Sequence, residues 1–280
     1  MMDKRVVAGL ALTLLFILTA GNNLVYSSLQ QEHTINSSGT INYDFSEHII
    51  FEHGGETGKI VPPWDAIQIR GGADGSVTLQ SSIVRSGDYA LRFYLNADNP
   101  PDTARAEVVN WNLGYKSLKD LYFSYWVYLP NDYRVDDWDA LFDNKYIVYG
   151  SPSVFYDLRK AILRSTGPGG APQVWVEWTD GVWRNSGVSF PRGEWVHCQQ
   201  HFKIGTSDGQ RQIWINNVLI YEETNANTAL TRQEVTATNI GTIEFKNYVG
   251  AGETSIIIKY LDDYVVATEK VPAYYRVIGK

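Results

Sequence analysis

The chain has few of the residues that redox chemistry or nucleic-acid binding require. Cys198 is the single cysteine among 280 residues, so no intrachain disulfide can form and stability must come from packing. The 24 Lys and Arg residues are outnumbered by 31 Asp and Glu residues, which gives a formal net charge of -7. Because no cluster of basic residues offers phosphate contacts, we expect no nucleic-acid partner. No protein partner is evident either.

Several catalytic signatures are also missing. The sequence contains no Gly-rich phosphate loop, no G-x-S-x-G elbow and no His or Cys spacing suited to zinc. These absences argue against phosphate-loop chemistry, against the serine hydrolases that carry the elbow, and against a zinc centre. We therefore expect no required cofactor.

Only one long apolar run is present, and it lies at the start of the chain. Met1 to Arg5 is short and basic, Val6 to Gly21 is almost wholly apolar, and polar residues follow from Asn22. A basic, then apolar, then polar order is typical of a secretory signal. The apolar run is shorter than the roughly 20 residues of a spanning helix. An uncleaved N-terminal anchor is the alternative. We assign residues 1–24 to a signal peptide or N-terminal anchor, 25–40 to a polar linker and 41–280 to one domain. The protein is expected to be secreted or on the extracellular surface.

The rest of the chain alternates between apolar and polar residues with a period of two. Runs such as YALRFYL, LYFSYWVYL, QVWVEW and RQIWINNVLIY are rich in aromatic and β-branched residues and are separated by Gly, Pro, Asn and Asp, which is typical of strands. One weak helix candidate, 151–164, contains Pro152. Because no internal repeat is present, a propeller is disfavoured. The pattern predicts an all-β fold, a two-sheet antiparallel β-sandwich of jelly-roll type.

Residues 193–223, GEWVHCQQHFKIGTSDGQRQIWINNVLIYEE, resemble the strand–turn–strand hairpin of concanavalin A-like lectin/glucanase domains. Ser207-Asp208-Gly209 supplies a turn, and Ile213, Ile215 and Val218 are expected to share one buried face. Asn217 stands where that family usually has Gly. Since Asn tolerates the left-handed conformation, this is a mild departure.

Two further segments narrow the resemblance. SGDYALRFYL with RAEV, and YLDDYVVATEKV, are similar to the jelly-roll polysaccharide lyases of the heparin lyase I and glucuronan lyase group. The resemblance covers most of residues 41–272 and implies a polysaccharide as the partner. RAEV also resembles the Arg-x-Glu-Leu motif of jelly-roll alginate lyases, which implies that Arg105 lies in a groove near the substrate carboxylate.

Charged residues interrupt two predicted strands. Arg92 and Tyr94 share one face of the first strand, and Arg105 and Glu107 share one face of the next. We expect both faces to line the same outer groove and to bind substrate. Arg105 and Glu107 could instead form a cross-strand ion pair that orders the sheet, and the two interpretations are compatible.

The resemblance implies β-elimination on a uronic acid polymer. This reaction needs a group that neutralises the carboxylate, a base for the C5 proton and an acid for the leaving oxygen. Arg105 is assigned to the first role and Tyr248 to proton transfer, as the acid, with the base role also open to it. Tyr248 lies in EFKNYVG, which is loosely similar to the alginate lyase F-K-x-G-x-Y segment, but it follows Lys246 by two residues instead of four. Lys246 is assigned to substrate binding.

The histidine that usually acts as base in this group is missing where it is expected. No histidine occurs between Arg105 and Glu194, and those of the hairpin, His197 and His201, are interpreted as packed or surface residues. His48 and His53 lie near the first strand. A mechanism with tyrosine alone stays open, and the other tyrosines on or near strands are Tyr122, Tyr128, Tyr146, Tyr149 and Tyr156.

The E-x-D-x-E carboxylate motif of glucanases on this fold is absent. Trp175 and Glu177 share a strand face and suit a sugar platform with a hydrogen-bonding partner.

Asp262 and Asp263 are expected either to bind a structural calcium ion, with Asp44 or Glu47, or to be a solvated pair.

Three function classes follow. The first is a secreted polysaccharide lyase that binds, and cleaves by β-elimination, a uronic acid-containing polysaccharide. The second is a noncatalytic carbohydrate-binding protein that uses the same groove, and the third is a structural protein of the cell surface. The arginine motif favours the first class, whereas the missing histidine favours the second.

Overall fold

The computed structural model forms two compact units, Met1–Asp44 and Phe45–Lys280. The structure describes residues 34–35, 41–42, 45–71, 74–96, 103–111, 118–142, 145–147, 155–157, 161–166, 170–178, 181–229, 239–250 and 253–277. In the first unit, β1 (Thr34–Ile35) pairs with β2 (Ile41–Asn42) in an antiparallel two-stranded sheet. The second unit contains all the other strands.

The second unit consists of two antiparallel sheets. The nine-stranded sheet contains β4 (Ala66–Arg70), β7 (Ala104–Asn110), β9 (Trp138–Phe142), β10 (Lys145–Ile147), β11 (Phe155–Asp157), β12 (Ala161–Arg164), β13 (Gln173–Glu177), β14 (Trp183–Ser189) and β18 (Asn239–Val249). The eight-stranded sheet contains β3 (Ile49–His53), β5 (Asp74–Gln80), β6 (Ala90–Asn96), β8 (Asp120–Tyr128), β15 (Trp195–Lys203), β16 (Gly209–Ile215), β17 (Val218–Ala226) and β19 (Ile256–Ala267).

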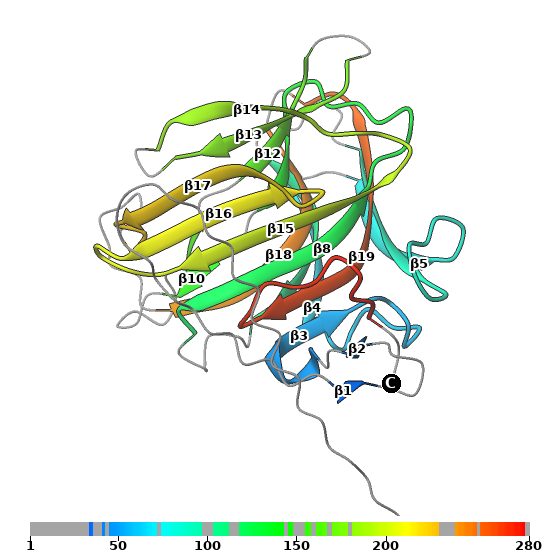
Figure 1. The fold of residues 1–280 in the computed structure, drawn as a ribbon. Coiled ribbons are helices and arrows are strands. Elements are labelled where there is room, and N and C mark those ends of the chain that lie inside the picture. Colours follow the sequence, from blue (N-terminus) through cyan, green and yellow to red (C-terminus); the bar gives the residue numbers. More distant parts are fainter. Residues whose placement is uncertain are drawn as a thin grey trace, which may run out of the picture. The chain divides into compact units, whose positions relative to one another are not determined.

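The two sheets lie face to face. In Figure 1, β17, β16, β15, β8 and β19 form one layer, and β18 lies behind it. In the rear sheet the order β4-β7-β18 continues to β9, β12, β13 and β14. This arrangement confirms the predicted all-β, two-sheet antiparallel sandwich.

The described part of the weak helix candidate forms strands β11 and β12. Strand β12 pairs with β9 on one side and β13 on the other, and Ala161, Ile162 and Leu163 are all buried. Among the described residues the one helix is a short 3-10 turn, η1 (Ser46–His48). In the part of the chain that the structure describes, no helix is long and apolar enough to cross a membrane.

Alternate side chains of the two sheets fill the core. Phe93 on β6 contacts Phe245 on β18, with ring centres 5.0 Å apart, and Tyr125 on β8 contacts the same phenylalanine at 5.2 Å. Cys198 on β15 is fully buried in this cluster. Burial of these apolar side chains is the main favourable contribution to folding, since no disulfide is present.

The hairpin that carries the family resemblance is formed by β15, β16 and β17. Asn216 and Asn217 form the tight turn between β16 and β17 with φ angles of 48° and 64°, so the expected left-handed conformation of Asn217 is confirmed. Ile213 and Ile215 are buried as predicted, but Val218 is 62% exposed. The prediction for Val218 was wrong because the turn places it at the start of the sheet-edge strand β17.

Candidate functional site

Arg105 and Glu107 lie on β7, the strand between β4 and β18. Arg105 is the direct cross-strand partner of Arg70 and of Tyr248, and Glu107 is that of Gln68 and Lys246. Ala104, Ala106 and Val108, which alternate with them, are fully buried in the core. The charged side chains therefore lie on the outer face of the nine-stranded sheet.

These side chains form a compact charged cluster. Arg105 Nε lies 3.1 Å from Glu107 Oε1, and Lys246 Nζ lies 3.7 Å from Glu107 Oε2 and 2.5 Å from Glu244 Oε2. The Arg105–Glu107 ion pair predicted as an alternative is therefore present. Glu107, Glu244 and Lys246 are almost fully buried, whereas one fifth of the Arg105 side chain is exposed. Because buried charges must be paired, Glu107 and Lys246 hold each other, and Arg105 is the cation that reaches the surface.

Tyr248 lies beside both cations. Its ring centre is 4.8 Å from Lys246 Nζ and 6.0 Å from Arg105 Cζ, and it is partly exposed. The structure thus brings together four predicted site residues: Arg105, Glu107, Tyr248 and Lys246. Lys246 is turned toward carboxylates of the protein itself rather than toward solvent.

The outer face continues as a row of aromatic and basic side chains. Trp138 on β9 packs edge-on against Tyr248, with ring centres 5.2 Å apart, and is the cross-strand partner of Arg164 on β12. The Arg164 guanidinium lies 5.0 Å from the ring centre of Trp175 on β13. We call Arg105, Tyr248, Trp138, Arg164 and Trp175 the outer track; all five are partly exposed.

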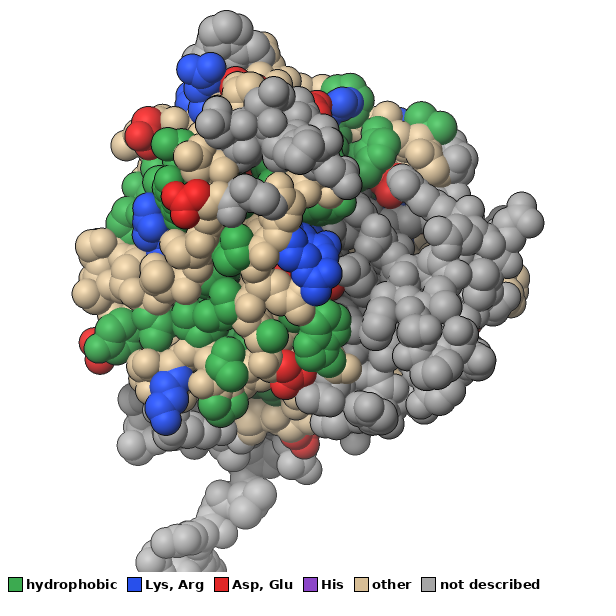
Figure 2. Space-filling model, turned by 180° about the vertical axis from the view of Figure 1, so that it is seen from behind, with side chains coloured by type: hydrophobic (Ala, Val, Ile, Leu, Met, Phe, Trp, Pro, Cys, Tyr) green, Lys and Arg blue, Asp and Glu red, His purple; other side chains and the backbone are tan. Residues whose placement is uncertain are grey.

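Figure 2 shows the molecule from behind the layer that faces the viewer in Figure 1. Among the described side chains in this view, hydrophobic ones are interspersed with basic and acidic ones. Such a mixture suits a sugar chain, which has apolar ring faces and polar edges, better than a nucleic-acid backbone.

Sequence reasoning missed Trp138 and Arg164. In AILR, the burial of Leu163 implies that Arg164 points outward, and this alternation could have identified Arg164 had the segment not been considered as a helix.

Glu177 was expected beside Trp175 on the surface, but it is only 1% exposed. The Glu177 backbone carbonyl accepts a hydrogen bond from Arg211, a fully buried residue of β16.

Arg92 and Tyr94 do not share this face. They lie on β6 in the eight-stranded sheet, where Phe93 and Leu95 point into the core. Since β7 belongs to the other sheet, their outward faces lie on opposite sides of the sandwich. The prediction that both strands line one groove was wrong, because the chain passes from one sheet to the other between Asn96 and Ala104.

The described histidines are also remote from the outer track. His53 Nδ1 on β3 accepts a hydrogen bond from Trp64 Nε1 at 3.1 Å, and His197 on β15 is 2.8 Å from Ser124 Oγ. His201, also on β15, is 2.7 Å from Asp120 Oδ1. Burial lowers the pKa of His197 to about 4. Among the described residues, no histidine lies on the outer face of the nine-stranded sheet.

The other candidate tyrosines do not join the outer track in the described structure. Tyr122 and Tyr128 lie on β8 in the eight-stranded sheet. The side chains of Tyr146 and Tyr156, and all of Tyr149, lie outside the described residues. Tyr248 is therefore the tyrosine that the described structure places next to Arg105.

Asp262 and Asp263 are buried, so the solvated alternative was wrong. Asp263 forms an ion pair with Arg85 and accepts hydrogen bonds from Ser86 Oγ at 2.9 Å and from the Val277 N–H at 2.7 Å. The Asp262 carboxylate accepts the N–H groups of Arg85, Ser86 and Asp263. Calcium requires a shell of oxygen ligands, whereas these carboxylates face a guanidinium and N–H donors. The donor set does not fit calcium.

The structure describes one of the two proposed additional calcium ligands. Glu47 is exposed on η1, and Asp44 lies outside the described residues. In the part of the chain that the structure describes, no group of three or more His, Cys, Asp or Glu side chains could hold a metal ion.

A buried ion pair lies beneath the outer track. Lys259 Nζ on β19 is 2.9 Å from Asp139 Oδ2 on β9 and donates to the carbonyls of Ala140 and Lys246, both at 2.7 Å. Asp139 Oδ1 accepts the backbone N–H of Tyr248 at 3.0 Å. Strands β18 and β9 pair only at Val249 and Asp139. The ion pair therefore provides hydrogen bonds to the Tyr248 N–H and the Lys246 carbonyl, where β18 has little pairing with β9.

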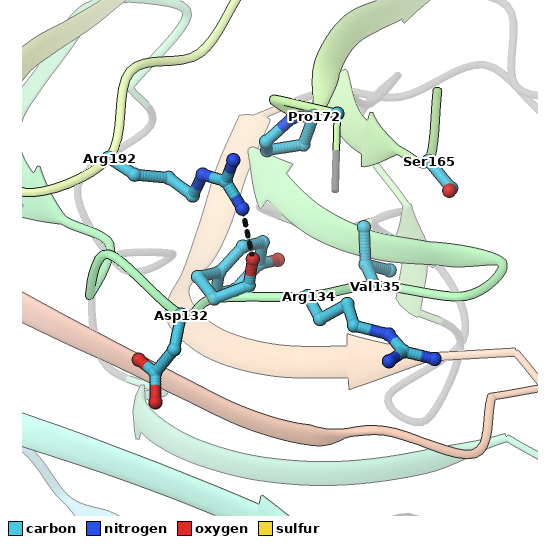
Figure 3. A pocket seen from close by; sticks show the side chains of 8 residues that line it. Asp132, Arg134, Val135, Ser165, Pro172 and Arg192 are labelled. Carbon is cyan, nitrogen blue, oxygen red and sulfur yellow. Dashed lines mark hydrogen bonds between the residues drawn. The ribbon is translucent and has the colours of Figure 1, made fainter. Parts of the chain in front are cut away.

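A cavity of about 240 Å³ adjoins β12 and β13. Figure 3 shows Ser165, which follows β12, and Pro172, which precedes β13, on one side of it, and Arg134 and Arg192 nearby. Arg192 donates a hydrogen bond to the Tyr133 carbonyl at 3.0 Å. The cavity adjoins the outer track in the chain, because its lining residue Ser165 directly follows Arg164.

Comparison with known proteins agrees with this architecture. The family model described as polysaccharide lyase matches residues 56–262. The endo-β-1,4-glucuronan lyase from the fungus Trichoderma reesei superposes with a TM-score of 0.61 at 15% identity, covering 79% of this chain and 96% of that one. The PL-14 alginate lyase from Aplysia kurodai gives 0.53 at 12% identity, with 79% and 99% coverage.

A third solved structure, the cellulose induced protein Cip1, gives a TM-score of 0.52 at 14% identity, covering 79% of this chain and 98% of that one. No curated protein matches the chain. At these identities the solved structures support the fold.

Proposed function

Because the chain belongs to the polysaccharide lyase family, we propose that it binds a uronic acid-containing polysaccharide along the outer track and cleaves it by β-elimination. The observation that carries the proposal is the direct cross-strand pairing of Arg105 with Tyr248 on the outer face of the nine-stranded sheet. Both side chains are partly exposed, and aromatic residues continue the row on one side.

Arg105 would neutralise the carboxylate of the uronic sugar. A guanidinium bound to this carboxylate stabilises the negative charge that develops when C5 loses its proton. The ion pair with Glu107 fixes the Arg105 side chain, and the Lys246 ammonium offsets the charge of Glu107. Arg105 is thus held in place without being withdrawn from the surface.

Tyr248 would move the proton. In a mechanism with tyrosine alone, the phenol gives its proton to the leaving oxygen as the C4–O bond breaks, and takes the proton from C5 as the C4–C5 double bond forms. Trp138 packs edge-on against the Tyr248 ring and limits its rotation. Trp175 and Arg164 would bind neighbouring sugars through a ring face and a carboxylate or hydroxyl.

The test is to follow the absorbance of the unsaturated product on glucuronan, alginate, heparin-type chains and a neutral glucan. We expect absorbance to rise on one acidic polymer and to be lost in Tyr248→Phe, which removes only the phenol oxygen. Tyr274→Phe, the same change at an exposed tyrosine of the segment after β19, is the matched control and should retain activity. Equal loss in both variants, or no product on any acidic polymer, would contradict the proposal.

A noncatalytic carbohydrate-binding protein is the second candidate. It is favoured by the described histidines, none of which lies on this face, and by the two carboxylates that engage Lys246. Binding of an acidic polymer without any rise in absorbance would support it. In that case Arg105→Ala should weaken binding by about 1.5–3 kcal/mol, the contribution of a charged hydrogen bond.

We also propose that the protein is exported. The basic, apolar and polar order of residues 1–24 supports this proposal. N-terminal sequencing of the protein recovered from the medium would show whether the segment is cleaved. Retention of the full chain inside the cell would contradict export.

A further inference from the structure

The eight-stranded sheet carries a second row of aromatic and basic side chains. Trp195 on β15, Tyr128 on β8, Tyr260 on β19 and Arg92 on β6 are successive cross-strand partners. Val127, Leu261 and Phe93, their neighbours along the strands, are fully buried in the core. The row therefore lies on the outer face of this sheet, on the opposite side of the sandwich from the outer track.

The members of this row contact each other. Tyr128 lies 5.6 Å from Trp195 and 5.8 Å from Tyr260, measured between ring centres. Arg92 Cζ is 5.4 Å from the ring centre of Tyr94, the next outward residue on β6. All are partly exposed except Tyr260, which is 9% exposed and forms the floor. We call these five residues the aromatic row.

The other half of this outer face is covered by the end of the chain. The segment after β19 passes over the sheet (Figure 1), where Gln199 Nε2 donates to the Val271 carbonyl at 2.9 Å. Lys270 Nζ lies 4.1 Å from the ring centre of Trp214. Trp126, two residues before Tyr128, has the Arg85 guanidinium 3.7 Å from its ring centre. Aromatic side chains on this half are thus used internally, whereas those of the aromatic row remain partly exposed.

A hollow of about 460 Å³ borders the aromatic row. It is lined by Pro130, two residues after Tyr128, and by Ile258, the cross-strand partner of Tyr94. Arg134 and Asp136 add polar groups to its wall. A flat aromatic surface beside a partly polar hollow offers both ring-stacking and hydrogen-bonding contacts.

We propose that the aromatic row is a second, noncatalytic binding surface for a chain of the acidic polysaccharide. Adjacent strands lie about 4.8 Å apart, so the row from Trp195 to Arg92 extends about 14 Å, the length of a short oligosaccharide. The aromatic rings can pack against the apolar faces of sugar rings. Arg92 forms no ion pair with any carboxylate of the described residues, which leaves its charge available for a uronate.

The identity of this ligand rests on the proposed function. The net charge of -7 repels a second copy of this chain and an acidic polymer alike at long range, so the local charge at the aromatic row decides between them. Arg92 is the cation of this row and can hold a uronate, whereas Arg134 in the wall of the hollow is paired with Asp136 at 3.2 Å. Self-association through this face is therefore an outcome that the test must be able to detect.

The experiment compares retention of the full-length protein in gels that contain the acidic polymer. Arg92→Gln and Trp195→Thr should each weaken retention about tenfold or more, the loss expected for a charged hydrogen bond or a large buried contact. Lys203→Gln is the matched control: it removes one charge at the far end of β15, where Lys203 pairs with Asp208 at 2.9 Å. Its retention should equal that of the parent chain, and circular dichroism would verify that all variants fold.

The same variants separate this inference from the proposed function. Elimination measured on short acidic oligosaccharides should be unchanged in Arg92→Gln and abolished in Tyr248→Phe. If the parent chain cleaves but retention is unaffected in Arg92→Gln and Trp195→Thr, the second surface is refuted and the lyase stands. If nothing is cleaved but retention depends on these residues, the lyase is refuted and the surface stands.

Two other results would overturn the second surface. One is retention that falls equally in Lys203→Gln, because the effect would then be one of overall charge. The other is concentration-dependent dimerisation in sedimentation that is lost in Trp195→Thr, because the row would then be an interface between copies. Absence of retention for the parent chain would refute the second surface, whereas the lyase would still be decided by the absorbance of the unsaturated product.

Discussion

At the scale of single residues, the buried pair of Asp139 and Lys259 holds the backbone on which Tyr248 is placed. Asp139 accepts the Tyr248 N–H, and Lys259 donates to the Lys246 carbonyl. Burial raises the pKa of Asp139 and lowers that of Lys259, because each charge is costly in the core without the other. The candidate catalytic residue therefore depends on a pair that touches no substrate.

Lys259→Met should consequently reduce stability strongly. The substitution leaves a buried carboxylate without its partner, and we expect the free energy of unfolding to fall by about 3–5 kcal/mol. Urea denaturation measures this value. Lys203→Met, which breaks an exposed ion pair with Asp208, should leave the unfolding midpoint nearly unchanged. A similar midpoint shift in both variants would argue against a special role for the buried pair.

Asp262 makes stability depend on pH. Burial, reinforced by the charge of Asp263, raises the pKa of Asp262 to about 8, far above the ordinary value near 3.8. Between these values the native state binds a proton that the unfolded state has released, so the free energy of unfolding should fall as pH rises from about 4 to about 8. Asp262→Asn should flatten this dependence, as measured by thermal unfolding at several pH values. An unchanged slope in Asp262→Asn would assign the effect to other groups.

At the scale of elements, the segment after β19 is fixed to the eight-stranded sheet by Arg85. Its guanidinium contacts Asp263 and donates to the Ala273 carbonyl at 3.1 Å. Asp263 has a φ angle of 47° at an irregular point in the pairing of β19 with β8, and its carboxylate also accepts the Val277 N–H. One irregular strand position therefore anchors the end of the chain.

We expect Arg85→Ala to loosen this segment. Loss of the buried ion pair should lower the free energy of unfolding by about 3 kcal/mol, and limited proteolysis should cut the segment after residue 268 sooner.

Calcium and a chelator should leave the melting temperature of the parent chain unchanged, because the donors around Asp262 and Asp263 do not fit the ion. A melting temperature that rises with calcium would restore the metal prediction.

Strand alternation explains what could be predicted of these elements from the sequence. It placed Arg92 and Tyr94 on an outward strand face, and Arg105 and Glu107 on another, since side chains of a strand alternate between its two faces. It could not assign β6 and β7 to different sheets, because alternation identifies the outward face of a strand but not the sheet to which the strand belongs. Trp138 and Arg164 were missed for a related reason: they come together through the pairing of β9 with β12, which is not encoded in local periodicity.

At the scale of the whole molecule, aromatic and basic side chains occur on both outer faces of the sandwich. The outer track lies on the nine-stranded sheet and the aromatic row on the eight-stranded sheet, with the apolar core between them. The core fixes the distance between the two faces, so a change at one surface should not alter the geometry of the other. The paired variants above depend on this independence.

The single buried thiol makes the integrity of the whole sandwich measurable. Cys198 is fully enclosed between the sheets, and burial raises the pKa of its thiol well above the ordinary value. A thiol reagent should therefore label the native chain only as fast as the sheets separate, so that the labelling rate measures the rate of opening. We expect Lys259→Met to raise the labelling rate and Lys203→Met to leave it unchanged, with mass spectrometry measuring the labelled fraction. Rapid labelling of the parent chain would show that the core opens far more easily than its packing implies.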